Sequence, residues 1–284
     1  MTVALETPPT AVPHGVPGRL SVAYRRLGDL CEALTVHIAD GSAEGHQVGV
    51  TGAELIDRQE AADAFVEAEA RRIHDRYGHT ARRDVAASRA LHDYAWSVGL
   101  LMSGVWYLER RVPLLRPQDV RLDLASGVFM ITPGSELVCL PDDPAARLPG
   151  ARVVPDEQSL HAELRTAVAD HMRPLLSALG PIVRRGPRAL WGMVADDLVS
   201  GIWYLGRTLG EEDDAVQAAT ALLPSAEAPF PGGADFRRLT GADGRVHPTR
   251  TRTGCCLYYT VRPAEACITC PRTCDAERLR RLEA

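Results

Sequence analysis

Apolar residues recur at intervals of three and four along most of the chain, and this spacing predicts amphipathic helices. The stretches that show it are residues 20–38, 51–77, 82–110, 157–179 and 188–209. The second is also rich in alanine, glutamate and arginine, which favour helices. We therefore expect a protein whose main part is helical.

The apolar period changes to two in three short regions, which indicates strands. Residues 120–124 alternate apolar and polar side chains. Residues 128–131 can form a second strand after a short turn that contains Gly127. Residues 136–140 can add a third strand. Nearer the C-terminus, residues 236–239 and 246–251 can pair as a hairpin. The predicted fold class is therefore α+β and mainly helical, with a small antiparallel β-hairpin region.

The pattern predicts three parts along the chain. Residues 1–18 contain four prolines and should form a flexible tail. Residues 19–235 should form the mainly helical body. Residues 236–284 should form a C-terminal segment, which contains five of the seven cysteines.

A short motif occurs twice in the body. The segment SGVWYL at residues 103–108 matches SGIWYL at residues 200–205, and both copies fall on predicted long helices. One interpretation is that the glycines let two core helices pack closely, with the aromatic rings as bulk. The other is that Trp106 and Trp203 form an aromatic wall for a bulky ligand.

Composition narrows the classes of function. The chain has 284 residues and a formal net charge of -5, so it lacks the excess of positive charge that would indicate nucleic-acid binding. It contains no lysine, which excludes a lysine Schiff base and a P-loop lysine. No stretch resembles a signal peptide or a membrane span, so we expect a cytoplasmic protein. In that compartment clustered cysteines are more often metal ligands than disulfides.

Four cysteines have a spacing that suits a metal site. Cys255 and Cys256 are adjacent, ten residues separate them from Cys267, and two more separate Cys267 from Cys270. A two-residue gap lets a turn bring two sulfurs to one metal. Adjacent side chains of a strand point to opposite faces, so the backbone must bend near the first pair, and Gly254 supplies that freedom. A two-iron cluster, being wider than one ion, demands a smaller bend.

The surrounding residues favour an anionic group. Pro271 suits the first position of a helix, which would place Cys270 at the N-cap, where free backbone N–H groups stabilise a thiolate. Arginines close in sequence can offset the negative charge of a cluster with four thiolates. They are Arg250, Arg252, Arg262 and Arg272.

Other interpretations of the cysteines stay open. A structural zinc ion or disulfides would also use clustered cysteines. Cys274 lies one helical turn after Cys270 and is either a spare thiol or an alternative ligand. Cys31 and Cys139 stand in apolar surroundings and should be buried without ligand roles.

The histidines lack a metal-binding spacing. We expect surface or structural roles for His74, His79, His92, His161 and His171. His247 is close to the cysteines in sequence, which leaves open a role in tuning a cluster.

The residues around the cysteines resemble a known family. RTGCCLYY at residues 252–259, followed by CITCP at residues 267–271, is similar to the C-terminal signature of the FhuF-like ferric siderophore reductases. The resemblance implies a cytoplasmic protein whose [2Fe-2S] cluster is held by Cys255, Cys256, Cys267 and Cys270. Such a protein reduces iron(III) in ferric, typically hydroxamate, siderophores and releases iron(II). Cys274 does not belong to the signature.

The resemblance also assigns roles to the rest of the chain. The body at residues 19–235 would bind the siderophore, and no acid, base or nucleophile is required beyond the cluster. Nothing resembles a glycine-rich nicotinamide or flavin site, so the electron donor should be a partner such as a ferredoxin. The alternatives are a non-catalytic iron–sulfur or zinc-binding sensor module, and a helical siderophore-binding or biosynthetic protein with a structural metal.

Overall fold

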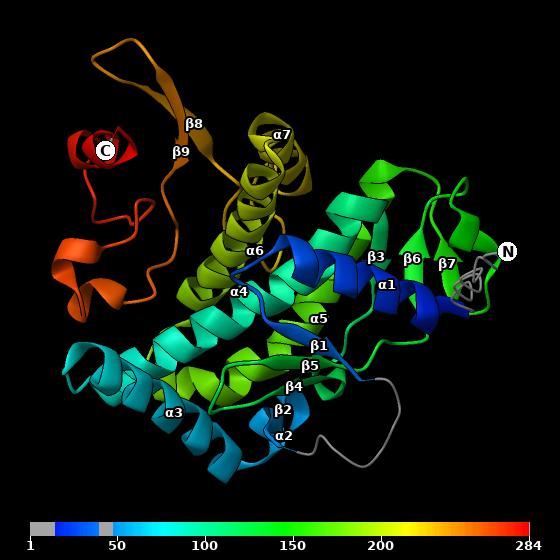
Figure 1. Cartoon of the computed structure of the whole chain (residues 1–284), viewed down its shortest axis with the longest axis horizontal. Helices are drawn as coiled ribbons and strands as arrows, with labels where there is room; N and C mark the ends of the chain where they lie inside the picture. The colour runs from blue at the N-terminus through cyan, green and yellow to red at the C-terminus, as the bar shows by residue number, and fades with distance from the viewer. Residues whose placement is uncertain (1–14, 40–47, 284) are drawn as a thin grey trace, which may run out of the picture.

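The computed structural model describes residues 15–39 and 48–283, and it is a mainly helical α+β protein (Figure 1). The helices are α1 (Gly15–Leu30), α2 (Gly52–Asp57), α3 (Gln59–Tyr77), α4 (Arg83–Glu109), α5 (Glu157–Val183), α6 (Pro187–Leu209), α7 (Glu212–Leu222) and α8 (Asp275–Leu282). The strands are β1 (Val36–Ile38), β2 (Val50–Thr51), β3 (Arg111–Pro113), β4 (Val120–Leu122), β5 (Phe129–Ile131), β6 (Leu137–Cys139), β7 (Ala151–Val153), β8 (Phe236–Thr240) and β9 (Val246–Arg250). The fold class is as predicted.

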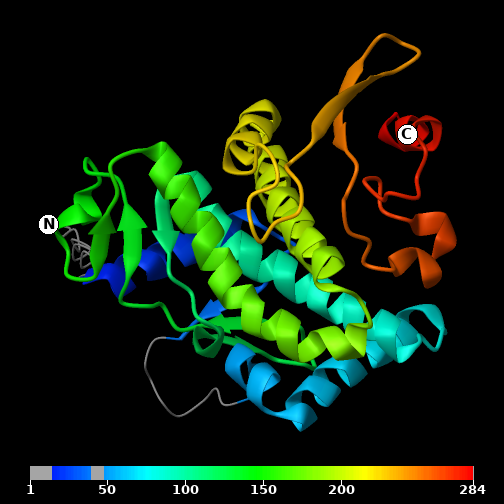
Figure 2. The same ribbon diagram turned by 180° about the vertical axis from the view of Figure 1, so that it is seen from behind.

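Helix α4 is the centre of the body. It packs against α1, α3, α5 and α6, and its buried face belongs to one continuous apolar core (Figures 1 and 2). At the crossing with α6, Gly99 faces the backbone of Leu198, and Gly201 faces Leu100. These glycines allow the two helix backbones to approach closely, because a larger residue would hold them apart.

The repeated motif serves this packing. Trp106 is 1% exposed and Trp203 is 6% exposed, so neither ring can form a wall for a bulky ligand. The Trp106 ring lies 5.3 Å from that of His161, and Trp203 donates a hydrogen bond to Glu212 at 2.8 Å. The interpretation as two core helices is therefore confirmed.

Two small sheets cover parts of the helical body. The first has the strand order β1-β5-β4-β2, with β4 and β5 antiparallel, as predicted for this pair, and β1 parallel to β5. The second has the order β3-β6-β7. The strand predicted at residues 136–140 is β6, but it pairs with β3 and β7 rather than with the β4–β5 hairpin.

Two helix predictions need correction, and one helix was missed. The predicted helix 20–38 ends at Leu30, and residues 36–38 are β1, since β-branched Val36 and Ile38 flank His37 with a period of two. The predicted helix 51–77 is two helices, because Arg58 is extended, and Thr51 with Glu54 forms a capping box at the start of α2. Helix α7 was not predicted at all.

The predicted N-terminal tail is only partly within the described residues. Residues 1–14 lie outside them. Helix α1 begins at Gly15, so the expected boundary at residue 18 is too late by one helical turn. Pro17 fits there, because the first turn of a helix tolerates proline.

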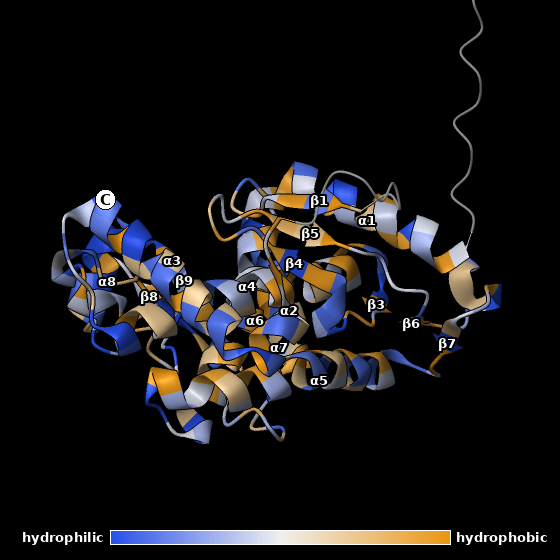
Figure 3. Ribbon diagram, turned by 90° about the horizontal axis from the view of Figure 1, so that it is seen from below, coloured by the Kyte–Doolittle hydropathy of each residue, from blue (hydrophilic) through white to orange (hydrophobic). Residues whose placement is uncertain are grey.

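The C-terminal segment lies at one side of the body. It comprises the predicted β8–β9 hairpin, two short 3₁₀ turns, η3 (Tyr258–Thr260) and η4 (Pro263–Glu265), and α8 beside β8 (Figure 1). Hydrophilic residues dominate α8, whereas hydrophobic residues concentrate in the middle of the body (Figure 3). Among the described residues, Val261 reaches only a small second apolar cluster with Ile73 and Val85. Polar contacts must therefore contribute much of the attachment.

Among the described residues, no helix has the length and apolar character needed to cross a bilayer.

Candidate metal centre

Four cysteines of the C-terminal segment surround one small pocket. They are Cys255, Cys256, Cys267 and Cys270. Two of them, Cys256 and Cys270, are buried, the other two are half-buried, and none of the four forms a disulfide. Two cysteine pairs with ten residues between them in sequence are thus brought to a common space, with Tyr258 and Tyr259 beside them.

Two backbone features shape the cysteine segment. Cys270 N–H donates to Cys267 O at 2.9 Å, which closes a turn around the two-residue gap, and Arg252 N–H donates to Thr269 O at 2.9 Å. After the adjacent pair the chain bends at Leu257, whose φ of 65° lies in the left-handed region. The chain also bends at Thr253 and Gly254, directly before the adjacent pair, so the bend expected at Gly254 is present.

Gly254 also has a second structural purpose. A Cβ at this position would lie 2.7 Å from Met193 N and 2.9 Å from Met193 Cα on α6. Only glycine lets the cysteine segment lie directly on the helix backbone. The contact is fixed by a hydrogen bond from Gly254 N–H to Asp196 Oδ2 at 2.6 Å.

Two buried aspartates on α6 anchor the segment. Asp196 and Asp197 are 0% exposed. Asp196 accepts a hydrogen bond from Arg250 Nη2 at 2.5 Å, and Asp197 pairs with Arg252. Because an unpaired charge is costly to bury, removing either partner of these ion pairs would destabilise the contact between the segment and α6. The sequence analysis missed them, although an acidic pair within the apolar run at residues 194–199 is an unusual pattern.

His92 belongs to the same network. Its Nδ1 lies 2.7 Å from Asp197 Oδ1 and 3.4 Å from Arg252 Nη2, so its role is structural. His247, on β9, does not line the cysteine pocket.

The positive charges near the thiols differ from those expected. Of the four predicted arginines, Arg252 does face Cys256 and Cys267, but Arg250 is held by Asp196. Arg262 pairs with Glu265, and Arg272 lies 4.2 Å over the ring of Tyr259.

Three arginines from elsewhere in the chain complete the surroundings. Arg89 of α4 interacts electrostatically with Cys256, and Arg185, between α5 and α6, donates to Cys255 O at 2.9 Å. Arg278 of α8 lies near Cys267 and Cys270. Positive charge thus reaches the thiols from the body, the α5–α6 link and the C-terminal helix, which suits an anionic group.

Burial favours the protonated form of the Cys255 and Cys267 thiols, because it raises the pKa of both. The pKa of Cys267 rises to about 11, while Arg252 opposes the shift there. Because the thiolate is the metal ligand, binding must release these protons. The negative charge of the resulting thiolates then faces the arginines.

Arg278 holds the turn that contains the second cysteine pair. Its side chain is 1% exposed. It donates to Ile268 O at 2.7 Å, and to Cys270 O and Thr273 O at 3.1 Å. Since these acceptors are backbone carbonyls on both sides of Cys270, one guanidinium fixes the path of the whole turn.

We expect Arg278→Lys to destabilise this segment by about 2–4 kcal/mol, because an ammonium cannot replace a guanidinium fork that binds three carbonyls. Urea unfolding followed by circular dichroism, together with iron content, measures the effect. Arg280→Lys is the matched control, since Arg280 forms an exposed pair with Glu277 on the same helix and should cost ~0.5 kcal/mol or less. Equal stability and iron content in the two variants would refute the role of Arg278.

Helix α8 begins later than expected. Its first residue is Asp275 and its N-cap is Cys274, so Pro271 does not start the helix and Cys270 is not at its N-cap. The extended backbone after the turn accounts for the shift. Cys274 is exposed and lies outside the cysteine pocket, whereas Cys31 and Cys139 are buried in the core as predicted.

Within the described part of the chain, no three Cys, His, Asp or Glu side chains are grouped as they would be around a single metal ion. Four thiol donors around a common pocket, with arginines facing them, fit an iron–sulfur cluster by donor chemistry and by charge.

Comparison with known families identifies this region. Residues 252–272 match the FhuF 2Fe-2S C-terminal domain, and the four cysteines fall within the match. No curated protein matches the sequence. The cofactor is therefore a [2Fe-2S] cluster.

Proposed function

Because the chain ends in a FhuF-type [2Fe-2S] domain, we propose that it is a ferric siderophore reductase. In this proposal it transfers one electron to iron(III) in an imported siderophore, a hydroxamate type by family resemblance, and iron(II) is released in the cytoplasm. The observation that carries the proposal is the four-cysteine pocket within the matched residues. A non-catalytic sensor would need the same pocket, so the test below separates the two.

We assign the cluster ligands to Cys255, Cys256, Cys267 and Cys270, which line the pocket. Arg278 holds the turn of the second pair, and Asp196 holds the backbone N–H that precedes the first pair. These contacts set the ligand positions before a metal arrives, which limits the reorganisation that accompanies a change of charge.

The reaction requires no acid, base or nucleophile from the protein. The bound cluster supplies one electron. Hydroxamate oxygens are hard ligands that hold iron(III) far better than iron(II), so reduction weakens the complex and leaves the carrier intact. The protein has to bind the chelate near the cysteine segment and receive electrons.

We propose that the helical body, up to residue 235, binds the siderophore and that residues 236–284 carry the cluster. The electron donor in this scheme is a protein such as a ferredoxin, which docks near the C-terminal segment. Support comes from the surface beside Cys256, where Arg89 lies 5.2 Å over the ring of Tyr258 and Tyr258 is hydrogen-bonded to Tyr77 at 2.9 Å. Aromatic and arginine side chains are common at protein interfaces.

The test uses protein prepared without oxygen. We expect a coloured protein with about two irons and two sulfides per chain, and a paramagnetic resonance signal after reduction. In a single-turnover reaction, mixing the reduced protein with a ferric hydroxamate should reoxidise the cluster. The iron(II) that is released is detected with a ferrous chelator. A colourless protein with one zinc ion would refute the proposal. A cluster that is inert toward every ferric chelate would favour the sensor.

A further inference from the structure

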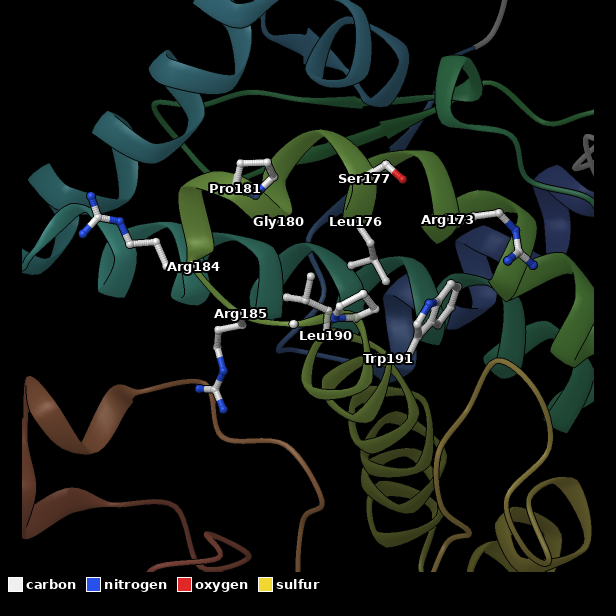
Figure 4. A pocket seen from close by; sticks show the side chains of 11 residues that line it. Arg173, Leu176, Ser177, Gly180, Pro181, Arg184, Arg185, Leu190 and Trp191 are labelled. Carbon is white, nitrogen blue, oxygen red and sulfur yellow. The ribbon is translucent and has the colours of Figure 1, made fainter.

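A second pocket lies between the C-terminal part of α5 and the start of α6. Its volume is ≈ 530 Å³, which is within the range of small-molecule sites. Leu176 and Leu190 line it with the ring of Trp191, and this apolar part lies between two helices (Figure 4). Neither the internal repeat nor any other sequence pattern indicated this site.

Three arginines surround the apolar part. Arg173 and Arg184 lie toward opposite ends of the pocket, and Arg185 points to the cysteine segment (Figure 4). No aspartate or glutamate lines the pocket, and none of the three arginines forms an ion pair within the described residues. Arg184 acts on Asp84 at longer range. This concentration of positive charge is notable in a chain of net charge -5.

The pocket is joined directly to the cysteine segment. Arg185 lines it and also donates to Cys255 O at 2.9 Å. One turn into α6, a Cβ at Gly192 would lie 3.3 Å from Thr253 Cγ2, so the cysteine segment passes close to this helix. A ligand in this pocket would therefore be separated from the first cysteine pair by little more than one side chain.

We propose that this pocket binds the ferric siderophore, and that it selects complexes that carry free or iron-bound carboxylates. The inference rests on the proposed function. Arginine guanidinium groups match carboxylates in geometry as well as in charge, and they form paired hydrogen bonds with them. Trp191 and the leucines contact the apolar backbone of the chelator, while Arg173 and Arg184 contact the carboxylates at its edge and Arg185 holds the cysteine segment beside it.

Charge distinguishes this class from other hydroxamates. In a simple trihydroxamate the three anionic groups balance iron(III), so the complex is neutral and gives the arginines nothing to pair with. In a dihydroxamate built on citrate, two hydroxamates and the central carboxylate already balance iron(III), and the deprotonated central hydroxyl that also binds the metal gives the complex a net negative charge. Its binding should weaken as salt increases, because partly exposed charges are screened.

The test measures binding apart from electron transfer. The cluster-loaded protein is titrated by calorimetry with gallium(III) complexes of a citrate-based dihydroxamate and of a neutral trihydroxamate. Gallium(III) has the charge and nearly the size of iron(III) but is not reduced. The variant is Arg173→Gln with Arg184→Gln, both at exposed positions. The control is Arg188→Gln, an exposed arginine on α6 that does not line the pocket.

We expect the double variant to bind the carboxylate complex ~10-fold more weakly and the neutral complex within about twofold of the parent. The control should bind both complexes as the parent does. Unchanged binding in the double variant, equal loss of both complexes, or a similar loss in the control would overturn the inference.

The outcomes also separate this inference from the proposed function. If the double variant reduces a neutral ferric trihydroxamate at the rate of the parent, and gallium binding shows no selectivity for carboxylates, the inference is overturned but the proposed reductase function stands. Selective gallium binding with no electron transfer to any ferric complex would overturn the reductase, and the pocket would then serve a binding protein.

Discussion

Replacing Cys267 with serine should leave the protein without its cluster, whereas the same replacement at Cys274 should leave it fully loaded. Cys267 lines the common pocket and accepts the N–H of Cys270 in the turn, while Cys274 is exposed at the start of α8. A serine hydroxyl is a hard, weakly acidic ligand that does not replace a thiolate on iron. The expected iron content is near zero for Cys267→Ser and about two per chain for Cys274→Ser.

Visible absorbance and iron analysis after anaerobic reconstitution measure both variants side by side. The two substitutions are chemically identical, and circular dichroism of both variants checks that a difference in iron content does not come from a loss of folding. Loss of the cluster in Cys274→Ser with retention in Cys267→Ser would show that the fifth thiol is a ligand and that the assignment is wrong.

The long helices could be predicted because their apolar stripes persist over several turns. Helix α4, predicted at residues 82–110, runs from Arg83 to Glu109. One error occurs where two periods coincide. Leu34, Val36 and Ile38 continue the apolar stripe of α1 but also alternate with a period of two. Residues 36–38 form a strand because they pair with β5.

The candidate site was predictable only as far as its chemistry is local in sequence. The spacing of four cysteines is such a local feature. Arg89, Arg185 and Arg278 come from α4, the α5–α6 link and α8, and no spacing rule brings them to the thiols. Proximity in sequence instead favoured Arg250, whose charge is held by an aspartate, and Arg262, which pairs with Glu265.

Asp196 should contribute more to the attachment of the cysteine segment than any exposed charge. Its two carboxylate oxygens accept from Arg250 at 2.5 Å and from Gly254 N–H at 2.6 Å, and all three groups are buried. Asp196→Asn keeps the size of the side chain but leaves the Arg250 guanidinium buried without a counter-charge. Breaking one side of a buried pair costs about 3–5 kcal/mol, far more than the pair itself contributes.

We therefore expect Asp196→Asn to lower the free energy of unfolding by about 3–5 kcal/mol and to release iron at lower urea than the parent. The control is Asp213→Asn, which breaks an exposed pair between α7 and Arg238 of β8 and should cost at most about 1 kcal/mol. Adding Arg250→Gln to Asp196→Asn should cost less than the sum of the single changes, because the second removes the charge that the first left unpaired. Additive costs in this cycle would mean that the carboxylate and the guanidinium act independently, and that the segment is held to α6 by other contacts.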